Sequence, residues 1–364
     1  MIEIREVNNK NQIKEFINIP WNIYKDDPNW VPPLKMSIAD QLNPTHPFYK
    51  TAKTKSFLAY ENGKPAGRIM SIINHNSPDI GYFGFYEAIN QQVSDQLFEK
   101  VKEHLKENGI NKMQGPVNLS TNYECGLLVD GFNDPPQIMM TYNPKNYINF
   151  FEHEGLTKAK DLYAWKFNLE KGLPEIIQRI ADRASNNPRF KVRKINKSKW
   201  NDEVKLMHQI YNEAWEDNWG FIPMTDEEFF HTAKDLKMIV EEELVKFVEV
   251  DGEVAGFIVA LPDLNQIFKK IPSGNLFPTG IFKLLFSKKS ISRMRVITMG
   301  LRPKFRNLGL DALMYHEGFH SGKKLGMNEV EMSWILADNV KMNKPIQRLG
   351  SELYKTYRIY HKDL

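Results

Sequence analysis

The sequence predicts two mixed α/β domains of one design in tandem, each built around a mixed sheet. A chain of 364 residues is long enough for two domains that each bury a core. Three landmarks recur with the same offset of 189 residues: Trp30 and Trp219, Gly63 and Gly252, Gly67 and Gly256. Because one offset fits all three, we expect the same fold twice, with strands and helices mixed in each half.

Each half centres on a predicted β-hairpin. Residues Asn62-Gly63 and Asp251-Gly252 are flanked by β-prone residues, and such pairs favour two-residue hairpin turns because both turn positions need a positive φ. Ahead of each hairpin, residues 12–25 and 202–217 show apolar residues three and four apart, which predicts a helix.

A strand followed by a helix comes after each hairpin. The strands are expected at 80–88 and 294–301. The first of the following helices is expected to begin at Ser94 as N-cap and to end at Gly109, and the second to cover 310–326. Each half then closes with a strand, a helix that ends at glycine and a Tyr-rich strand. We place the boundary near residue 170, which gives domains 1–170 and 171–364.

Composition narrows the class of protein. With 41% hydrophobic and 26% charged residues the chain is globular. A single cysteine, Cys125, excludes an internal disulfide, and the first residues alternate charged and apolar, so we expect a cytoplasmic protein. A net charge of +4 is too small to indicate nucleic acid as a partner.

The stretch "RPKFRNLGLD", residues 302–311, is a candidate anion-binding loop. It joins a predicted strand to a predicted helix, and backbone N–H groups that lead into a helix N-terminus suit a pyrophosphate. Arg306 adds a cation and Gly309 permits close approach, whereas Asp311 places a negative charge near the same point. The first half has "INQQVSD" here, without glycine, so the second half is the candidate binding half.

This element order and loop resemble the GNAT superfamily of acyl-CoA-dependent N-acyltransferases. Nearly the whole chain, including "WNIYKDDPNWVPPL", "GPVNLSTNYECGLLVDGF" and "KTYRIYHKDL", is similar to the tandem-GNAT group that contains bacterial ceramide synthase. The resemblance implies acyl-CoA or acetyl-CoA as co-substrate, without a metal. It also implies acyl transfer to an amine, with a long-chain, sphingoid-type lipid amine as one acceptor.

The resemblance also assigns residues to roles. It implies that the strand before the loop meets the thioester and that the loop and helix start hold the pyrophosphate; the residues are Met299, Gly300, Leu301, Arg306, Gly309 and Leu310. A tyrosine after the last helix would protonate the leaving thiolate, and Tyr354 and Tyr357 are the candidates. An ordinary half-buried strand is the alternative for both tyrosines.

Residues 115–136 form an unusually polar segment where a strand should lead into a helix. Glu124 is the candidate general base, and Asn118, Thr121 and Asn122 are candidate substrate contacts, together with Trp219 in the second half. A polar loop that satisfies its own backbone is the competing interpretation. Cys125 has no histidine partner in sequence, so a small buried thiol is expected.

Two further patterns stand out. The motif "HEGFH", residues 316–320, has the spacing of a zinc protease, but the same segment is needed as the helix after the loop, so we expect no metal. Residues 265–295 carry seven basic and no acidic side chains among four phenylalanines, which suits either peripheral contact with an anionic membrane or a solvated loop.

Together these patterns indicate an acyl-CoA-dependent N-acyltransferase. A non-catalytic GNAT-fold binding or scaffold protein is the alternative, favoured by Asp311 and by the missing loop in the first half. Aminoacyl transfer from tRNA is a third class, which would show nucleic-acid binding that falls with salt.

Overall fold

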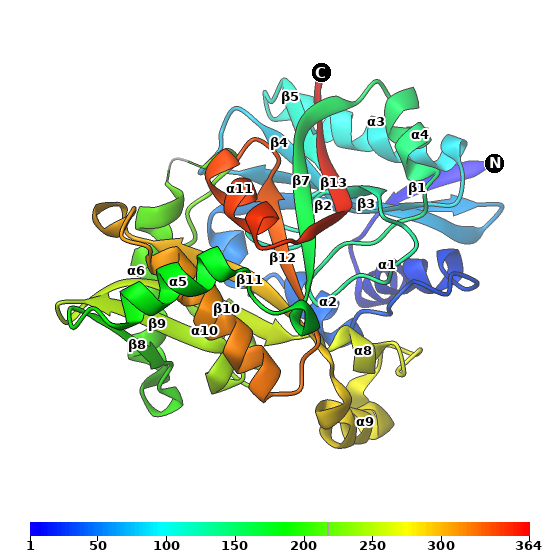
Figure 1. The fold of residues 1–364 in the computed structure, drawn as a ribbon. Helices are drawn as coiled ribbons and strands as arrows, with labels where there is room; N and C mark the ends of the chain where they lie inside the picture. Colours follow the sequence, from blue (N-terminus) through cyan, green and yellow to red (C-terminus); the bar gives the residue numbers. More distant parts are fainter. Residues whose placement is uncertain (217) are drawn as a thin grey trace. The chain divides into compact units, whose positions relative to one another are not determined.

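The computed structural model describes residues 1–216 and 218–364 (Figure 1). The chain forms two compact units, and neither is continuous in sequence. Unit 1 consists of Met1–Leu162, Ile267–Phe286 and Lys355–Leu364. Unit 2 consists of Tyr163–Gln266 and Ser287–Tyr354.

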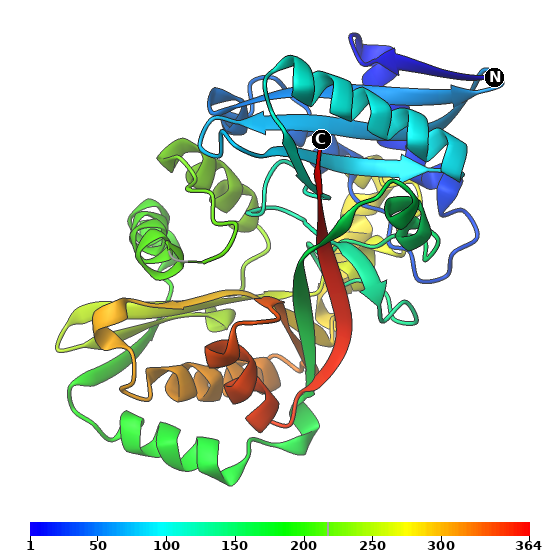
Figure 2. The ribbon, with the colours of Figure 1, turned by 90° about the horizontal axis from the view of Figure 1, so that it is seen from above.

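Unit 1 contains a mixed sheet in the strand order β1-β2-β3-β4-β5-β13. The strands are β1 (Ile2–Glu6), β2 (Ala52–Glu61), β3 (Lys64–Asn74), β4 (Gly81–Ala88), β5 (Lys112–Gly115) and the last part of β13 (Glu352–Asp363). Neighbouring strands run antiparallel except for β4 and β5, which are parallel. Helix α3 (Gln91–Glu107) covers one face and α1 (Lys10–Ile23), with α2 (Lys35–Gln41), lies on the other (Figure 2).

The predicted hairpin of unit 1 is confirmed, and the predicted start of its following helix is wrong. Asn62 and Gly63 have φ of 51° and 77°, as a two-residue turn with two positive φ values requires. Helix α3 begins earlier than Ser94, because the side chain of Asn90 accepts a hydrogen bond from the N–H of Val93 at 2.9 Å. Ser94 is buried inside the helix, where its Oγ accepts from the hydroxyl of Tyr86 at 2.6 Å.

After β5 the chain of unit 1 makes a long excursion before α4 (Tyr147–His153). The excursion contains residues 116–126 and then a short strand, β6 (Leu127–Asp130), which pairs with β13. The polar segment 115–136 therefore also contains a short strand, β6, whose apolar Leu127 and Leu128 are buried.

The strands of unit 2 follow the order β7-β12-β11-β10-β9-β8. They are the last part of β7 (Thr157–Asn168), then β8 (Phe190–Lys194), β9 (Val245–Val250), β10 (Glu253–Pro262), β11 (Arg293–Leu301) and β12 (Glu329–Leu336). The hairpin between β9 and β10 turns at Asp251 and Gly252, with φ of 52° and 82°, as predicted.

Helices cover both faces of the unit 2 sheet. Helices α5 (Glu175–Ser185) and α10 (Leu310–Lys324) pack together on one face, with α11 (Val340–Arg348) between β12 and β13 in the chain. Helices α6 (Trp200–Trp215) and α7 (Asp226–Leu236) lie on the other face, as Figure 2 shows. Residue 217, the last of the predicted helix 202–217, lies outside the described residues.

Most of the basic segment 265–295 forms an insertion between β10 and β11, and its last three residues belong to β11. It contains α8 (Asn265–Phe268) and α9 (Ile281–Ser287), and its middle, Ile267–Phe286, belongs to unit 1. Within the described part of the chain, no helix has both the length and the apolar character needed to span a membrane.

Candidate active site

In unit 2, two parallel neighbouring strands stop pairing halfway along their length. Strands β11 and β12 pair in register from Arg293 with Glu329 to Val296 with Met332. Beyond that point β11 continues to Leu301 and β12 to Leu336. The register of β11 with β10 also shifts here, between the partners of Val259 and Ala260, which marks a bulge. Beyond Val296 the backbone groups of β11 on the β12 side have, among the described residues, no pairing with that strand, so they are available to an extended ligand.

The loop after β11 leads into a helix start that its own side chains do not cap. Gly309, the N-cap residue of α10, has φ 78° and makes no side-chain cap. Glycine adopts this left-handed backbone without the steric cost that other residues pay. Within the described part of the chain, the first N–H groups of α10 receive no side-chain cap from Gly309, which suits an anionic group.

Basic side chains surround this helix start. Arg302 and Lys304 both pair with Glu253, at 3.1 and 2.6 Å, while the exposed Arg306 donates to the carbonyl of Ala214 at 3.3 Å. The hydrogen bond from Lys304 holds the pKa of Glu253 below its usual range. Arg302 is largely buried, and both it and Lys304 are paired with Glu253, so the exposed Arg306 is the side chain of this loop that best suits a pyrophosphate.

Asp311 remains the feature that opposes an anion. It lies half-buried in the first turn of α10. Burial, together with the charge of Asp311, raises the pKa of the nearby Tyr315 hydroxyl. The acid also interacts favourably with the positive end of the helix dipole, so it stabilises the helix while weakening its attraction for anions.

In unit 1 the edge of β4 and the start of α3 correspond to the edge of β11 and the start of α10. Both are closed by groups of unit 1 itself. The N–H of Val117 donates to the carbonyl of Phe83 at 2.8 Å, and the N–H of Phe85 donates to Asn118 Oδ1 at 2.9 Å. The excursion after β5 therefore occupies the edge of β4 that corresponds to the open edge of β11. The helix start is also occupied, because Asn90 caps α3 with its own side chain.

Side chains of β11 alternate between two faces. Val296, Met299 and Leu301 pack with the apolar core that includes Leu310 of α10. Thr298 and Gly300 point to the opposite face, where a Cβ on Gly300 would lie 2.4 Å from Trp215. Gly300 is thus needed for the close packing of α6.

Thr298 carries a buried hydroxyl at the start of the open edge. Among the described residues, its Oγ1 has no hydrogen-bond partner. A buried hydroxyl without a partner is costly. A ligand that runs along β11 would supply the missing partner, so this atom fits an extended thioester group.

Next to the point of separation lies a buried polar cluster, which we call the Glu331 cluster. Glu331 and Arg295 sit directly opposite each other in the β11–β12 register, 3.5 Å apart. The hydroxyls of Ser333 and Tyr354 donate to the two carboxylate oxygens of Glu331. Arg295 Nε in turn donates to Ser333 Oγ at 2.8 Å. The cluster fixes the hydroxyl of Tyr354, one of the predicted acids, in a single position.

The other predicted site residues lie in both units. Asn118 Nδ2 donates to Glu124 at 3.3 Å, so Glu124 holds the residue that closes the β4 edge in unit 1. Thr121 and Asn122 lie half-buried in the same excursion. Trp219 lies half-buried between α6 and α7 in unit 2.

Two further residues of unit 1 complete the predicted set. Tyr357 is fully buried, and its Cβ lies 3.1 Å from the position that a Cβ on Gly126 would take. Cys125 is buried and not in a disulfide, as expected.

Unit 1 contains a buried acid that sequence analysis missed. Glu87 accepts hydrogen bonds from Tyr24 at 3.0 Å and Tyr147 at 2.8 Å, and its carboxylate lies 3.7 Å from Arg68, its cross-strand partner. Burial raises the pKa of Glu87 to about 7, against the lowering effect of Arg68. The sequence contained a signal for both buried acids, Glu87 and Glu331, because each is a charged residue within a predicted apolar strand.

The "HEGFH" motif brings two imidazoles together on α10. His316 Nε2 and His320 Nε2 are 3.0 Å apart, and Gln178 Nε2 lies 3.0 Å from His316 Nε2. Over residues 1–216 and 218–364, this pair belongs to no group of three His, Cys, Asp or Glu side chains close enough to share an ion.

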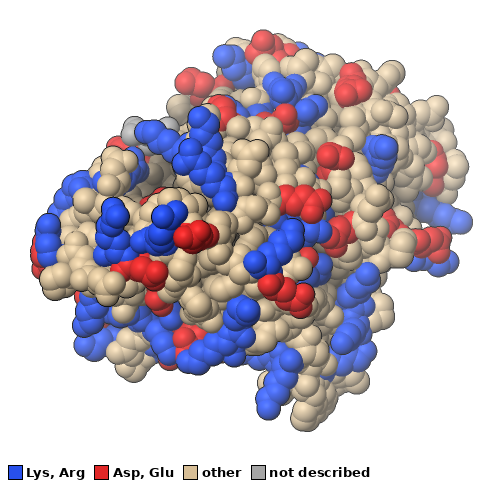
Figure 3. Space-filling view, viewed as in Figure 1, with Lys and Arg blue, Asp and Glu red and all other residues tan. Residues whose placement is uncertain are grey.

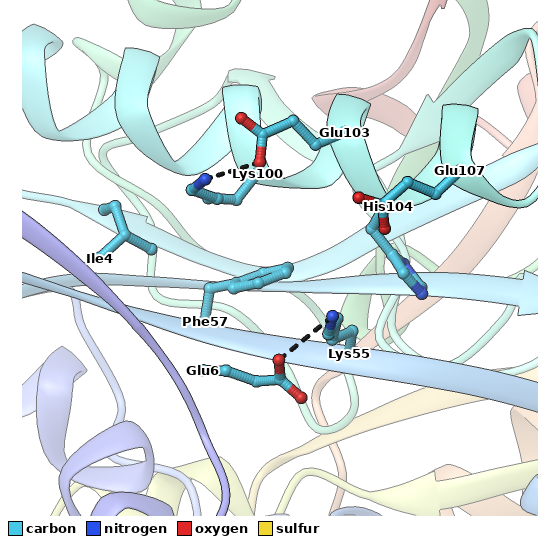
Figure 4. A pocket seen from close by; sticks show the side chains of 8 residues that line it. All are labelled: Ile4, Glu6, Lys55, Phe57, Lys100, Glu103, His104 and Glu107. Atoms are coloured by element: carbon cyan, nitrogen blue, oxygen red, sulfur yellow. Dashed lines mark hydrogen bonds and ion pairs between the residues drawn. The ribbon is translucent and has the colours of Figure 1, made fainter.

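A surface pocket of unit 1 offers little for binding a charged ligand. Figure 4 shows eight side chains of β1, β2 and α3 around it. Its lysines are already paired, Lys55 with Glu6 at 3.2 Å and Lys100 with Glu103 at 2.6 Å. We therefore place the candidate site at the separation of β11 and β12.

The fold and this site define a tandem GNAT protein. A tandem GNAT protein from the clavulanic acid biosynthesis pathway matches with a TM-score of 0.61 over 100% of this chain and 98% of that one, at 9% identity. A GCN5-related N-acetyltransferase from Sphaerobacter thermophilus matches with a TM-score of 0.58 over 100% and 95%, at 11% identity. Matches at such low identity establish the fold alone.

Full-length relatives place the chain more narrowly. It is 36% identical over 367 residues to the bacterial ceramide synthase of Caulobacter vibrioides (strain NA1000 / CB15N), covering 97% of this chain and 95% of that protein. It is 33% identical over 378 residues to Protein YghO of Escherichia coli (strain K12), covering 99% and 95%. No protein-family model matches. The chain belongs to the tandem GNAT family, in the group that includes these two proteins.

Proposed function

We propose that this protein is an N-acyltransferase that uses acyl-CoA, with the co-substrate bound by unit 2. One contrast supports the proposal. Among residues 1–216 and 218–364, no side chain is seen to close the β11 edge or to cap the α10 N-terminus of unit 2, whereas Asn118 and Asn90 close the same two positions in unit 1. In this proposal 171–364 is the repeat that binds the co-substrate, and 1–170 is the repeat that does not.

Specific residues of unit 2 would hold the co-substrate. The N–H groups of Leu310 and the following residues, with Gly309 and the exposed Arg306, suit the pyrophosphate. The backbone of Met299, Gly300 and Leu301 would meet the thioester arm, and Thr298 Oγ1 would gain a partner there.

The co-substrate would supply an activated acyl group. The amine nitrogen forms an amide bond to the acyl carbon while the carbon–sulfur bond breaks; the nitrogen loses a proton and the leaving thiolate gains one. Tyr354 is the proposed proton donor to the thiolate, and Glu331 positions its hydroxyl. Glu124 stays a proposed base and Tyr357 a second proposed acid. Asn118, Thr121, Asn122 and Trp219 stay proposed substrate contacts.

The proposed acceptor is a lipid amine with a long chain. The name of the Caulobacter relative, bacterial ceramide synthase, supports a sphingoid-type amine and a long-chain acyl group. The proposed location is the cytoplasm, with peripheral contact at the inner face of the membrane through residues 265–295. The exposed Lys269, Lys270 and Lys283 of that segment, which contains no acidic residue, support the contact.

Calorimetry tests the proposal directly. Acetyl-CoA and palmitoyl-CoA are titrated into the wild type, Arg306→Ala and the control Arg189→Ala, which removes another exposed arginine of unit 2. A hydrogen bond to a charged group contributes about 1.5–3 kcal/mol, so loss of Arg306 should weaken binding roughly tenfold or more. Arg189→Ala should bind as the wild type does. The tighter ligand indicates the acyl chain length.

Two results would reject parts of the proposal. If neither thioester binds, the loop is not a co-substrate site. If both bind but a panel of amines, including sphinganine, yields no amide by mass spectrometry, the protein is a GNAT-fold binding protein rather than an enzyme. Asp311 favours the first outcome, because its charge opposes binding of the pyrophosphate.

A further inference from the structure

The insertion between β10 and β11 carries an unusual concentration of exposed apolar side chains. Phe277, Phe282, Leu285 and Phe286 are 65%, 57%, 64% and 82% exposed. We call these four residues the apolar tip. Large exposed apolar groups that cluster in one short segment mark a surface that another apolar phase covers.

The apolar tip stands on a well-anchored base. Ile267 and Ile271 are buried, and the carbonyl of Gly274 accepts from the N–H of Lys35 at 2.9 Å. Trp21 Nε1 donates to the carbonyl of Pro272 at 2.7 Å. Gly274 also lies so close to Trp21 that a Cβ would sit 2.3 Å from its ring. These contacts of residues 267–274 fix the start of the insertion in unit 1. The four side chains of the apolar tip stay outside the core.

The tip is ordered within itself. The rings of Phe282 and Phe286, one turn apart on α9, stack with centroids 6.5 Å apart and an angle of 11°. The two residues thus present one continuous apolar face of α9.

Cations flank the tip without acidic neighbours in the segment. Lys269, Lys270 and Lys283 are exposed, and Lys283 Nζ donates to the carbonyl of Lys270 at 2.6 Å. No acidic residue occurs between Asn265 and Arg295. Figure 3 shows the projection that contains α9 as uncharged surface bordered by blue side chains. Arg293 and Arg295 do not contribute, since they pair with Asp263 and Glu331 within unit 2.

We infer that the apolar tip inserts into the surface of an anionic lipid bilayer, with Lys269, Lys270 and Lys283 at the level of the phosphates. Aromatic and leucine side chains beside lysines are the composition that favours the membrane interface. The inference rests on the membrane contact of the proposed function and deepens it, but its evidence is the geometry of the insertion, and it is tested separately from acyl transfer.

Co-sedimentation with vesicles tests the inference on the full chain. The vesicles are phosphatidylcholine alone or phosphatidylcholine with phosphatidylglycerol. The wild type should bind the anionic vesicles and bind the neutral ones more weakly. The combined change Phe282→Ser with Phe286→Ser should reduce binding by a factor on the order of 10 or more. Each of Lys269→Gln, Lys270→Gln and Lys283→Gln should reduce it about fivefold.

Controls separate insertion from other causes. Met238→Ser changes an apolar side chain of unit 2 that is 79% exposed, and it should leave vesicle binding unchanged. Thermal unfolding checks that the double variant folds, and because the tip is exposed we expect an unchanged Tm.

Three outcomes would overturn the inference. The first is absence of wild-type binding to both vesicles. The second is equal binding by the wild type and the double variant. The third is a wild-type dimer in sedimentation velocity that the double variant converts to monomer, since the tip would then be an interface between two copies. Acyl transfer to a soluble short-chain amine is measured in parallel as a control for the fold of unit 2. It should be equal in all variants, because the altered residues lie outside the proposed active site.

Discussion

Gly309→Ala isolates the contribution of one backbone conformation to co-substrate binding. Gly309 has φ 78°, and an L-residue in the left-handed region costs about 1–2 kcal/mol. The stiffer unfolded chain offsets about 0.4–1 kcal/mol of this, so we expect a net loss of roughly 1 kcal/mol of unfolding free energy. The new Cβ also lies 3.2 Å from Ile180 Cγ2, and Ile180 is partly exposed and able to give way. For domains of this size the Tm should fall by about 2–4 °C.

Binding should respond more strongly than stability. Relaxation of the strained residue would turn the first N–H groups of α10 away from the pyrophosphate. Loss of one charge-assisted hydrogen bond, about 1.5–3 kcal/mol, corresponds to roughly 10- to 100-fold weaker binding of acetyl-CoA. Calorimetry and differential scanning fluorimetry measure the two effects on the same preparation.

Gly326→Ala is the matched control. Gly326 follows the other end of α10, has φ 76°, and has no atom within 4 Å of an added Cβ. Gly326→Ala should lower the free energy of unfolding by a similar amount and bind acetyl-CoA with wild-type affinity. The reasoning is refuted if Gly309→Ala binds acetyl-CoA as tightly as Gly326→Ala while both unfold at the same lowered temperature.

Three other variants follow from the geometry. Asp311→Asn should lower the stability of α10 by about 0.5 kcal/mol while acyl-CoA binding tightens several-fold, and calorimetry that shows weaker binding would contradict the electrostatic argument. Tyr354→Phe should lower kcat about 100-fold with KM within about twofold, whereas an unchanged kcat would remove it as the acid. The pKa of Glu87, raised to about 7, means that folding takes up a proton, so stability should fall by up to roughly 3 kcal/mol between pH 5 and pH 8. Glu87→Gln should flatten that part of the pH profile in urea titrations.

Local signals made part of the fold predictable. The hairpin turns depend on two adjacent residues that accept positive φ, and both formed at the predicted positions, Asn62-Gly63 and Asp251-Gly252. The candidate loop could also be predicted from local sequence, because a glycine between a strand and a helix fixes where the helix starts. The wrong prediction that Ser94 is the N-cap also arose from local sequence, because Asn90 and Ser94 are both good N-cap residues. The short connection after β4 makes Asn90 the N-cap.

Long-range pairing set the limit of prediction for the site. Arg295 and Glu331 meet because β11 and β12 are parallel in one particular register, and Arg68 and Glu87 meet through another. A shift of one residue would separate each pair, and no short motif encodes the register. Closure of the β4 edge by Asn118 likewise depends on the path of a loop, whose polar composition is compatible both with a functional site and with a loop that satisfies its own backbone.

Strands β13 and β7 each belong to one half of the sequence and pair with strands of the other half, which constrains how the chain can evolve. Residues 112–115 of the first half pair with residues 360–363 at the end of the second, and the sheet of unit 2 is completed by β7 from the first half. A gene cut near residue 170 would leave each product with an unpaired strand edge, which favours aggregation. Because strands from each half complete the pairing of the other, we expect each half to need the other for folding. Either copy is then free to change its surface chemistry, but neither can be deleted.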